Sequence, residues 1–182
     1  MKIRYMLVLA VVAMATYLVL VVGTGGSQKE TMEELLTKPE VRYQAPDFKG
    51  ISLQGEEMSL AQHEGKPVFL NFWASWCPPC QAEMPDLNAL YKTYGEQVAF
   101  FGINTTLNDS EEAARDFAGL YQVEYPIVID PKGEISKEYQ IIAMPTSFIL
   151  DAKGKIVYKK IGPVTIEEFE RVVQPLLQKG NP

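Results

Sequence analysis

The sequence predicts an α/β fold in which helices flank a central mixed sheet. Val68 to Trp73 is almost continuously apolar, as expected for a central strand that is covered on both faces. The segment after it carries an apolar stripe at spacings of three and four residues, which predicts an amphipathic helix: Met84, Leu87, Tyr91 and Tyr94. Strand and helix patterns follow one another as βαβαβ and then ββα, an order typical of a layered α/β domain.

The remaining elements follow from turn signals and hydrophobic spacing. Two short runs on either side of Gln54-Gly55, residues 48–53 and 57–60, predict a small hairpin at the edge of the sheet. Thr165 and Glu168 form a capping box that opens the last helix. Asp109-Ser110-Glu111-Glu112 opens an earlier one. We expect further strands at residues 98–103, 125–130, 147–151 and 155–159.

The N-terminus predicts a membrane anchor. Residues 5–22 are uncharged and apolar, which is just long enough to span a bilayer, since a helix needs about 20 such residues. Lys2 and Arg4 precede this run and place the N-terminus in the cytoplasm and the remainder outside. A cleaved signal peptide is the alternative, but its apolar region is usually shorter. We expect an anchor (or uncleaved signal) over residues 1–23, a spacer over 24–44 and an extracytoplasmic domain over 45–182.

Composition excludes several functions. The net charge is −6, and it becomes −8 for the exported part without Lys2 and Arg4. An acidic domain has no electrostatic footprint for nucleic acid, so no such partner is expected. The chain has two cysteines and one histidine, whereas a structural zinc site usually needs four such ligands. We therefore expect no metal and no cofactor beyond the cysteine pair itself. We also expect a monomer.

Both cysteines lie in the segment Trp76-Cys77-Pro78-Pro79-Cys80. This segment joins the predicted central strand to the start of the next helix, where two thiols separated by two residues can close and open a disulfide reversibly. As a structural staple the bridge would constrain the unfolded chain little, because its loop is so short. The pair therefore predicts a thioredoxin-type thiol–disulfide oxidoreductase.

The two cysteines are expected to have different roles. Cys77, at the helix start, is predicted to be the nucleophile, because the helix dipole favours its thiolate; Cys80 would be the resolving thiol. Pro78 and Pro79 have no amide hydrogen, and no histidine lies between the cysteines, so few groups stabilise the thiolate. The pair should therefore be reducing. Trp76 is interpreted as a shield of the site or, equally, as an ordinary packing residue.

Four segments carry a resemblance to a known family: residues 45–48, 71–80, 83–85 and 144–148. They resemble the membrane-anchored, extracytoplasmic thioredoxin-like proteins of the ResA, TlpA and CcmG family, which act as thiol reductants in cytochrome c maturation. Residues 130–162 also resemble StoA, a relative linked to endospore cortex synthesis. The resemblance implies a thioredoxin-like fold with an N-terminal β-hairpin and a central α/β insertion.

The resemblance also implies roles for individual residues. Glu83 would lie near the thiols and tune them by its charge, although a solvated helix glutamate is the alternative. Pro145 would be cis, opposite the cysteines, and Met144 would be a flexible apolar contact for substrate. Asn71 stands where ordinary thioredoxins have a buried aspartate. An amide cannot take a proton, so Cys80 cannot be deprotonated by a group at this position. The expected substrate contacts are Trp76, Pro78, Pro79, Met144 and Pro145.

The implied substrate is an oxidised protein. It would be apocytochrome c, whose haem-binding cysteines must be reduced, or a cell-wall enzyme of the spore pathway. The electron donor would be a membrane thiol carrier of the CcdA type. Three other functions stay open: a disulfide-forming oxidase, a non-catalytic binding module, and a peroxidase, which is suggested only by Ala45-Pro46-Asp47-Phe48.

Overall fold

The computed structural model describes residues 40–63 and 65–179, together with Met14 and Thr16, which are both helical. The chain divides into two compact units, Met1–Met32 and Glu33–Pro182. Apart from those two residues, the predicted anchor and the spacer as far as residue 39 lie outside the described residues. Within the part that is described, no helix is long and apolar enough to cross a membrane.

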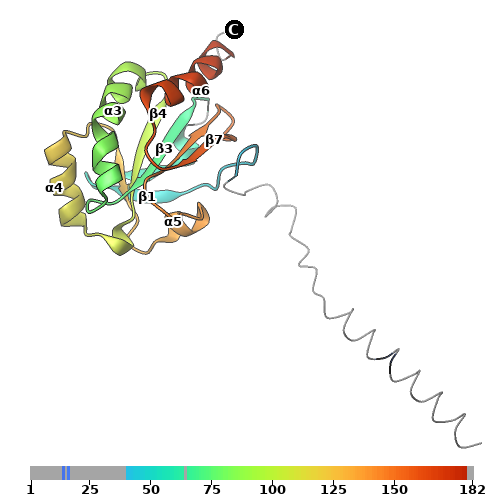
Figure 1. Cartoon of the computed structure of the whole chain (residues 1–182), viewed down its shortest axis with the longest axis horizontal. Helices are drawn as coiled ribbons and strands as arrows, with labels where there is room; N and C mark the ends of the chain where they lie inside the picture. Colours follow the sequence, from blue (N-terminus) through green and yellow to red (C-terminus); the bar gives the residue numbers. More distant parts are fainter. Residues whose placement is uncertain (1–13, 15, 17–39, 64, 180–182) are drawn as a thin grey trace, which may run out of the picture. The chain divides into compact units, whose positions relative to one another are not determined.

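The described part of the second unit contains one mixed sheet of seven strands, in the order β2-β1-β5-β4-β3-β6-β7 (Figure 1). The strands are β1 Lys49–Ser52, β2 Glu57–Ser59, β3 Val68–Trp73, β4 Ala99–Asn104, β5 Ile127–Ile129, β6 Thr146–Leu150 and β7 Ile156–Ile161. Central strand β3 is parallel to β4 and antiparallel to β6. β1 and β2 form the predicted antiparallel hairpin, with β2 at the sheet edge. The predicted mixed α/β sheet is confirmed.

Helices cover both faces of this sheet (Figure 1). The longer ones, α3, α4 and α6, contribute to the hydrophobic cluster on one face, and α5 contributes to the cluster on the other. The helices are α3 Pro78–Tyr94, α4 Glu111–Tyr121, α5 Glu134–Glu138 and α6 Ile166–Lys179, with short 3-10 turns η1 Leu60–His63 and η2 Thr106–Asn108. This layering puts the start of α3 directly above the carboxyl end of β3.

The predicted capping box opens α6. The Glu168 N–H donates to Thr165 Oγ1 at 3.3 Å, and the Thr165 N–H donates to Glu168 Oε2 at 3.1 Å. These reciprocal bonds satisfy two backbone donors that the helix itself leaves unpaired. Buried Phe169 follows and packs on Phe69 of β3, with ring centroids 5.4 Å apart.

Alternation along β3 sorts its side chains between the two clusters. Phe69 and Trp73 belong to the cluster under α3, whereas Leu70 and Phe72 belong to the one under α5. Asn71 is on the same side as Phe69 and Trp73, because side chains alternate with a period of two. An amide is thereby placed in an apolar layer directly beneath the helix that carries the cysteines.

Besides shifts of one or two residues at the strand ends, the structure differs from the sequence-based expectation in one helix and at the start of the folded unit. Helix α5 was not predicted, because five residues after Pro131-Lys132-Gly133 are too few to show helical periodicity. Residues 40–44, expected in the spacer, are bonded to β7: the Arg42 N–H donates to Ile156 O at 2.7 Å, and the Ile156 N–H donates to Tyr43 O at 2.9 Å. The folded unit therefore begins before Ala45.

Candidate active site

The two cysteines form a disulfide at the start of α3, with Cα atoms 5.3 Å apart. Cys77 is the N-cap residue of the helix, and its sulfur accepts a hydrogen bond from the Cys80 N–H at 3.3 Å. Cys77 is 2% exposed and Cys80 is fully buried. Cys77 is thus less accessible than its predicted role implies, because both sulfurs belong to the apolar cluster under α3.

Pro78 and Pro79 occupy the first two positions of α3, where both are exposed. Neither proline has an amide hydrogen. The first amide of the helix that can donate to the Cys77 sulfur is therefore that of Cys80. Trp76 is 56% exposed, and its Nε1–H donates to Asn108 O at 2.7 Å. It is therefore not an ordinary buried tryptophan: its ring is held at the surface beside the pair.

Below the disulfide, Glu83 is 2% exposed and belongs to a buried polar network. The side-chain amide of Asn71 donates to Glu83 Oε1 at 2.8 Å and to Ser147 Oγ at 3.0 Å. The second carboxylate oxygen of Glu83 accepts from the Val164 N–H at 3.0 Å. Glu83 is therefore not a solvated helix glutamate, and it joins α3 to β3 and to the loop before α6.

Burial sets the proton affinity of Glu83. It raises the pKa of this carboxyl to about 7, although the hydrogen bonds from Asn71 and Val164 and the charge of Lys160 oppose the rise. A carboxylic acid with such a pKa exchanges its proton near neutral pH. Glu83 lies one helical turn after Cys80, so a proton-binding group is built into the helix that carries the dithiol.

The segment before β6 supplies the second half of the site. The Met144–Pro145 peptide bond is cis, as the resemblance implies, and Pro145 is buried. Met144 is half-buried, and its sulfur accepts from the Thr105 hydroxyl at 3.0 Å. Met144 and Thr105 line a cavity of about 450 Å³ that also includes Asn108, the residue bonded to Trp76.

Asp109 was missed as a site residue, because in the sequence it reads as part of a helix start. Its carboxylate accepts from the Ser75 N–H at 2.6 Å and from the Ser75 hydroxyl at 2.7 Å. Ser75 lies two positions before Cys77 but 34 positions before Asp109. Nothing in the local pattern indicates a contact over that separation.

Among the described residues, no group of three or more His, Cys, Asp or Glu side chains could hold a metal ion. The site in this part of the chain consists of the disulfide, the buried carboxyl group of Glu83 and the surfaces around them.

Comparison with known proteins agrees with this geometry. Residues 41–159 match the model of the AhpC/TSA family. Thioredoxin-like protein YneN of Bacillus subtilis (strain 168) is 40% identical over 156 residues, which cover 85% of this chain and 91% of that protein. Thiol-disulfide oxidoreductase ResA of Bacillus thuringiensis subsp. konkukian (strain 97-27) is 38% identical over 142 residues, covering 76% and 80%.

A solved structure gives the same result. The crystal structure of StoA from Bacillus subtilis matches with a TM-score of 0.62 and 37% identity, and the match covers 69% of this chain and 95% of that chain. The fold is thioredoxin-like, and a cysteine pair at a helix start defines the class as thiol–disulfide oxidoreductases. The chain belongs to the AhpC/TSA family, and within it to the ResA- and StoA-like thiol–disulfide oxidoreductases.

Proposed function

We propose that this protein reduces specific protein disulfides outside the cytoplasm, with the disulfides of apocytochrome c as its substrates. The observation that carries the proposed direction of electron flow is the pair of prolines at the first two positions of α3, whereas the substrate is proposed from the resemblance to the ResA, TlpA and CcmG family. The prolines remove two amide donors from the neighbourhood of Cys77. A thiolate with fewer donors is less stable, which disfavours the reduced form of the pair and makes it a better reductant.

The reaction exchanges one disulfide for another. The Cys77 thiolate attacks one sulfur of the substrate disulfide, forming a mixed disulfide and releasing one substrate thiolate. Cys80 then loses its proton and attacks the Cys77 sulfur, which releases the second substrate thiolate and leaves the Cys77–Cys80 disulfide. Two electrons pass to the substrate, whose thiolates take up two protons. The described disulfide corresponds to the product state of this cycle.

Glu83 would accept the proton that Cys80 loses. It follows Cys80 by one turn, it is buried, and its pKa of about 7 allows it to take up and return a proton at neutral pH. The buried aspartate of ordinary thioredoxins is replaced by Asn71, which cannot take a proton. Asn71 instead donates to the Glu83 carboxylate.

The substrate would lie between Trp76 and the Met144–Pro145 segment. The ring of Trp76 is exposed, and Met144 lines the adjacent cavity. Pro78 and Pro79 are exposed at the helix start and would complete this surface. An extended polypeptide could pair with the backbone before Pro145, as in strand addition.

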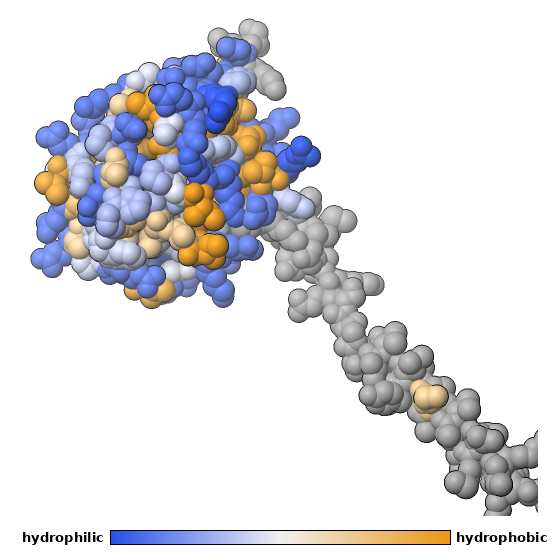
Figure 2. All heavy atoms as spheres, in the orientation of Figure 1, coloured by the Kyte–Doolittle hydropathy of each residue, from blue (hydrophilic) through white to orange (hydrophobic). Residues whose placement is uncertain are grey.

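The proposed location follows from the apolar run at residues 5–22 and the positive charges before it. The face of the folded unit seen in Figure 2 is largely hydrophilic, as expected for a domain in an aqueous compartment. A membrane thiol carrier of the CcdA type would return the pair to its dithiol form. A StoA-like role on a cell-wall enzyme is the second candidate, because 37% identity to StoA is close to the identity to ResA.

The test is the reduction potential of the full chain in detergent micelles, equilibrated in dithiothreitol or glutathione buffers. We expect a value near or below that of thioredoxin, about −270 mV. A value near −120 mV, that of a strong disulfide donor, would reverse the proposed direction of electron flow. Reduction of a disulfide-bonded apocytochrome c peptide and of a cell-wall enzyme by the dithiol form then discriminates between the two substrates.

A further inference from the structure

One connection between strand and helix is bonded to both halves of the active site. This connection, residues 104–110, runs from the end of β4 into α4. The Thr105 N–H donates to Trp73 O at 3.0 Å, and the Thr105 hydroxyl donates to the Met144 sulfur at 3.0 Å. Asn108 O accepts from Trp76 Nε1 at 2.7 Å. The chain before the disulfide and the segment before β6 are therefore held by the same few residues.

The carboxylate of Asp109 accepts more hydrogen bonds than any other side chain of this connection. It accepts both donors of Ser75, as described above, and also the Asn104 side-chain amide and the Ser110 N–H, each at 2.9 Å. Four donors thus converge on one half-buried carboxylate. They come from the chain before Cys77, from the end of β4 and from the start of α4.

Ser75 is fixed from a second side as well. Its carbonyl oxygen accepts from Gln81 Nε2 at 3.0 Å, and Gln81 lies on α3 after both cysteines. The chain entering Cys77 is therefore tied to Asp109 by its N–H and hydroxyl and to the helix by its carbonyl. Three polar groups of Ser75 therefore have partners outside its own segment, two on Asp109 and one on Gln81.

The carboxylate is ionised at neutral pH. Burial alone would raise the pKa of Asp109, but the hydrogen bonds from Ser75, Asn104 and Ser110 outweigh burial and hold the pKa below its ordinary value. Charge-assisted hydrogen bonds of this kind are stronger than neutral ones. The two hydrogen bonds that the Ser75 N–H and hydroxyl donate to Asp109 form what we call the Ser75 clamp. Because the carboxylate is charged at neutral pH, both bonds are charge-assisted there.

We propose that Asp109 is a positioning residue for the redox pair, whose carboxylate holds Ser75 so that the chain enters Cys77 in the conformation that closes the disulfide. Reduction adds two electrons and two protons to the disulfide and frees the two sulfurs. Closing it again restricts the loop, and a loop that is already held loses less conformational freedom. This effect favours the disulfide and makes the dithiol more reducing.

The test is the redox equilibrium of Asp109→Asn, measured with the full chain in detergent micelles against oxidised and reduced dithiothreitol. Asparagine keeps the size of the side chain but loses the charge and one of the two accepting oxygens. We expect the equilibrium constant for disulfide formation to fall about tenfold, which raises the potential by about 30 mV. A role in folding alone would stabilise the oxidised and reduced forms equally and leave this equilibrium unchanged.

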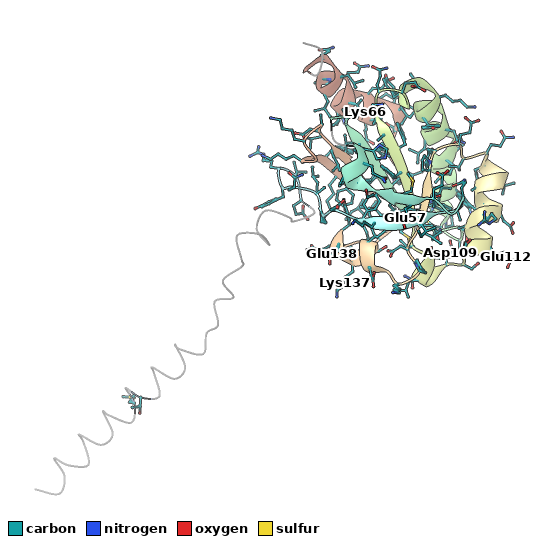
Figure 3. All side chains as sticks on the ribbon, turned by 180° about the vertical axis from the view of Figure 1, so that it is seen from behind. Glu57, Lys66, Asp109, Glu112, Lys137 and Glu138 are labelled. Carbon is teal, nitrogen blue, oxygen red and sulfur yellow. A yellow bond between two sulfur atoms is a disulfide. The ribbon has the colours of Figure 1, made fainter. Side chains whose placement is uncertain are left out.

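Glu112→Gln is the matched control for charge. Glu112 is exposed in the first turn of α4 and lies close to Asp109 (Figure 3). We expect the equilibrium constant for disulfide formation in Glu112→Gln to stay within about twofold of wild type, because no hydrogen bond joins Glu112 to the chain before Cys77. If Glu112→Gln and Asp109→Asn changed the equilibrium constant for disulfide formation equally, the effect would come from net charge and not from the contact with Ser75. That result would overturn the proposal.

Ser75→Ala removes one bond of the clamp and should lower the equilibrium constant about threefold. In Asp109→Asn the effect of Ser75→Ala should be clearly smaller than in wild type, because both changes act on the same contact. An unchanged equilibrium in either single variant, or additive effects in the double variant, would overturn the proposal. Ser75→Ala decides alone if Asp109→Asn does not fold. The inference deepens the proposed function but is tested separately, because the wild-type potential tests that function and the difference between variants tests Asp109.

Discussion

Asn71 on β3 donates its side-chain amide to the carboxylate of Glu83 on α3, over 2.8 Å, between the sheet and the helix that carries the cysteines. Both side chains are buried, and the carboxylate has a second donor in the Val164 N–H. Two neutral donors compensate the burial of Glu83 only in part, so its pKa is raised to about 7. The protein therefore keeps a group in its interior whose charge changes at neutral pH.

The first prediction concerns stability against pH. The pKa of Glu83 is near 4.5 in the unfolded chain and about 7 in the folded one, so the folded state binds more protons between these values. Stability from this group is complete below about pH 4.5 and is lost as pH rises to 7. Since one pKa unit corresponds to about 1.4 kcal/mol, the difference in unfolding free energy between wild type and Glu83→Gln should fall by about 3 kcal/mol over this range.

Guanidinium unfolding of the oxidised protein at pH 4.5, 6 and 8 measures that difference. Glu138→Gln, a change at an exposed glutamate, serves as the control and should show no such trend. A difference between wild type and Glu83→Gln that is flat across the pH range would mean that Glu83 is ionised throughout.

The second prediction concerns Asn71. Replacing it by alanine leaves Glu83 Oε1 and Ser147 Oγ without their common donor. A buried acceptor that loses its partner costs about 1–3 kcal/mol, and more when it is charged. Asn71→Ala should therefore lower the unfolding free energy by about 2 kcal/mol, with a larger loss at pH 8 than at pH 5. Asn108→Ala, at an exposed asparagine, is the control and should change the unfolding free energy by less than about 0.5 kcal/mol.

The third prediction separates the two cysteines. In Cys80→Ser the mixed disulfide between Cys77 and substrate cannot be resolved, so a covalent complex should accumulate on non-reducing gels. In Cys77→Ser it should not, because the remaining Cys80 lies inside the first turn of α3 and not at the N-cap, where the helix dipole favours a thiolate. Equal accumulation in both variants would contradict the assignment of Cys77 as nucleophile.

The fourth prediction concerns the layer between β3 and α6. Phe169 is fully buried and its ring lies against those of Phe69 and Phe100. Phe169→Ala should destabilise the protein by about 3–5 kcal/mol, the usual cost of such a cavity. Leu120→Ala removes an apolar side chain that is 77% exposed and should cost less than about 0.5 kcal/mol. Thermal unfolding of the two variants measures both losses of stability. If Phe169→Ala cost no more than Leu120→Ala, α6 would not unfold cooperatively with the sheet.

Sequence patterns predicted the elements whose signals are local. The apolar run that became β3 is contiguous, and the capping box of α6 spans four residues, so each can be recognised without a partner. The cysteine pair was predicted for the same reason. The order of the elements follows from such signals because they mark where a helix begins or that a strand is buried.

The polar contacts of the site depend on the tertiary fold. Glu83 and Val164 are 81 positions apart, and Ser75 and Asp109 are 34 apart. No periodicity links such residues, so the sequence indicated Glu83 through its spacing from Cys80 and through resemblance, and it did not indicate Asp109. The burial of Cys77 was missed because a helix start predicts the orientation of its N-cap but not what packs around it.

Residues 40–44 lie along the outer side of the first residues of β7, where Arg42 and Tyr43 pair with the backbone of Ile156. β7 is the last strand of the sheet, and an uncovered edge strand offers its free N–H and C=O groups to other chains. A protein shortened to begin at Ala45 would lack this cover. We expect it to keep its disulfide and core but to expose the N–H and C=O of Ile156 at the sheet edge, where another chain can pair with them.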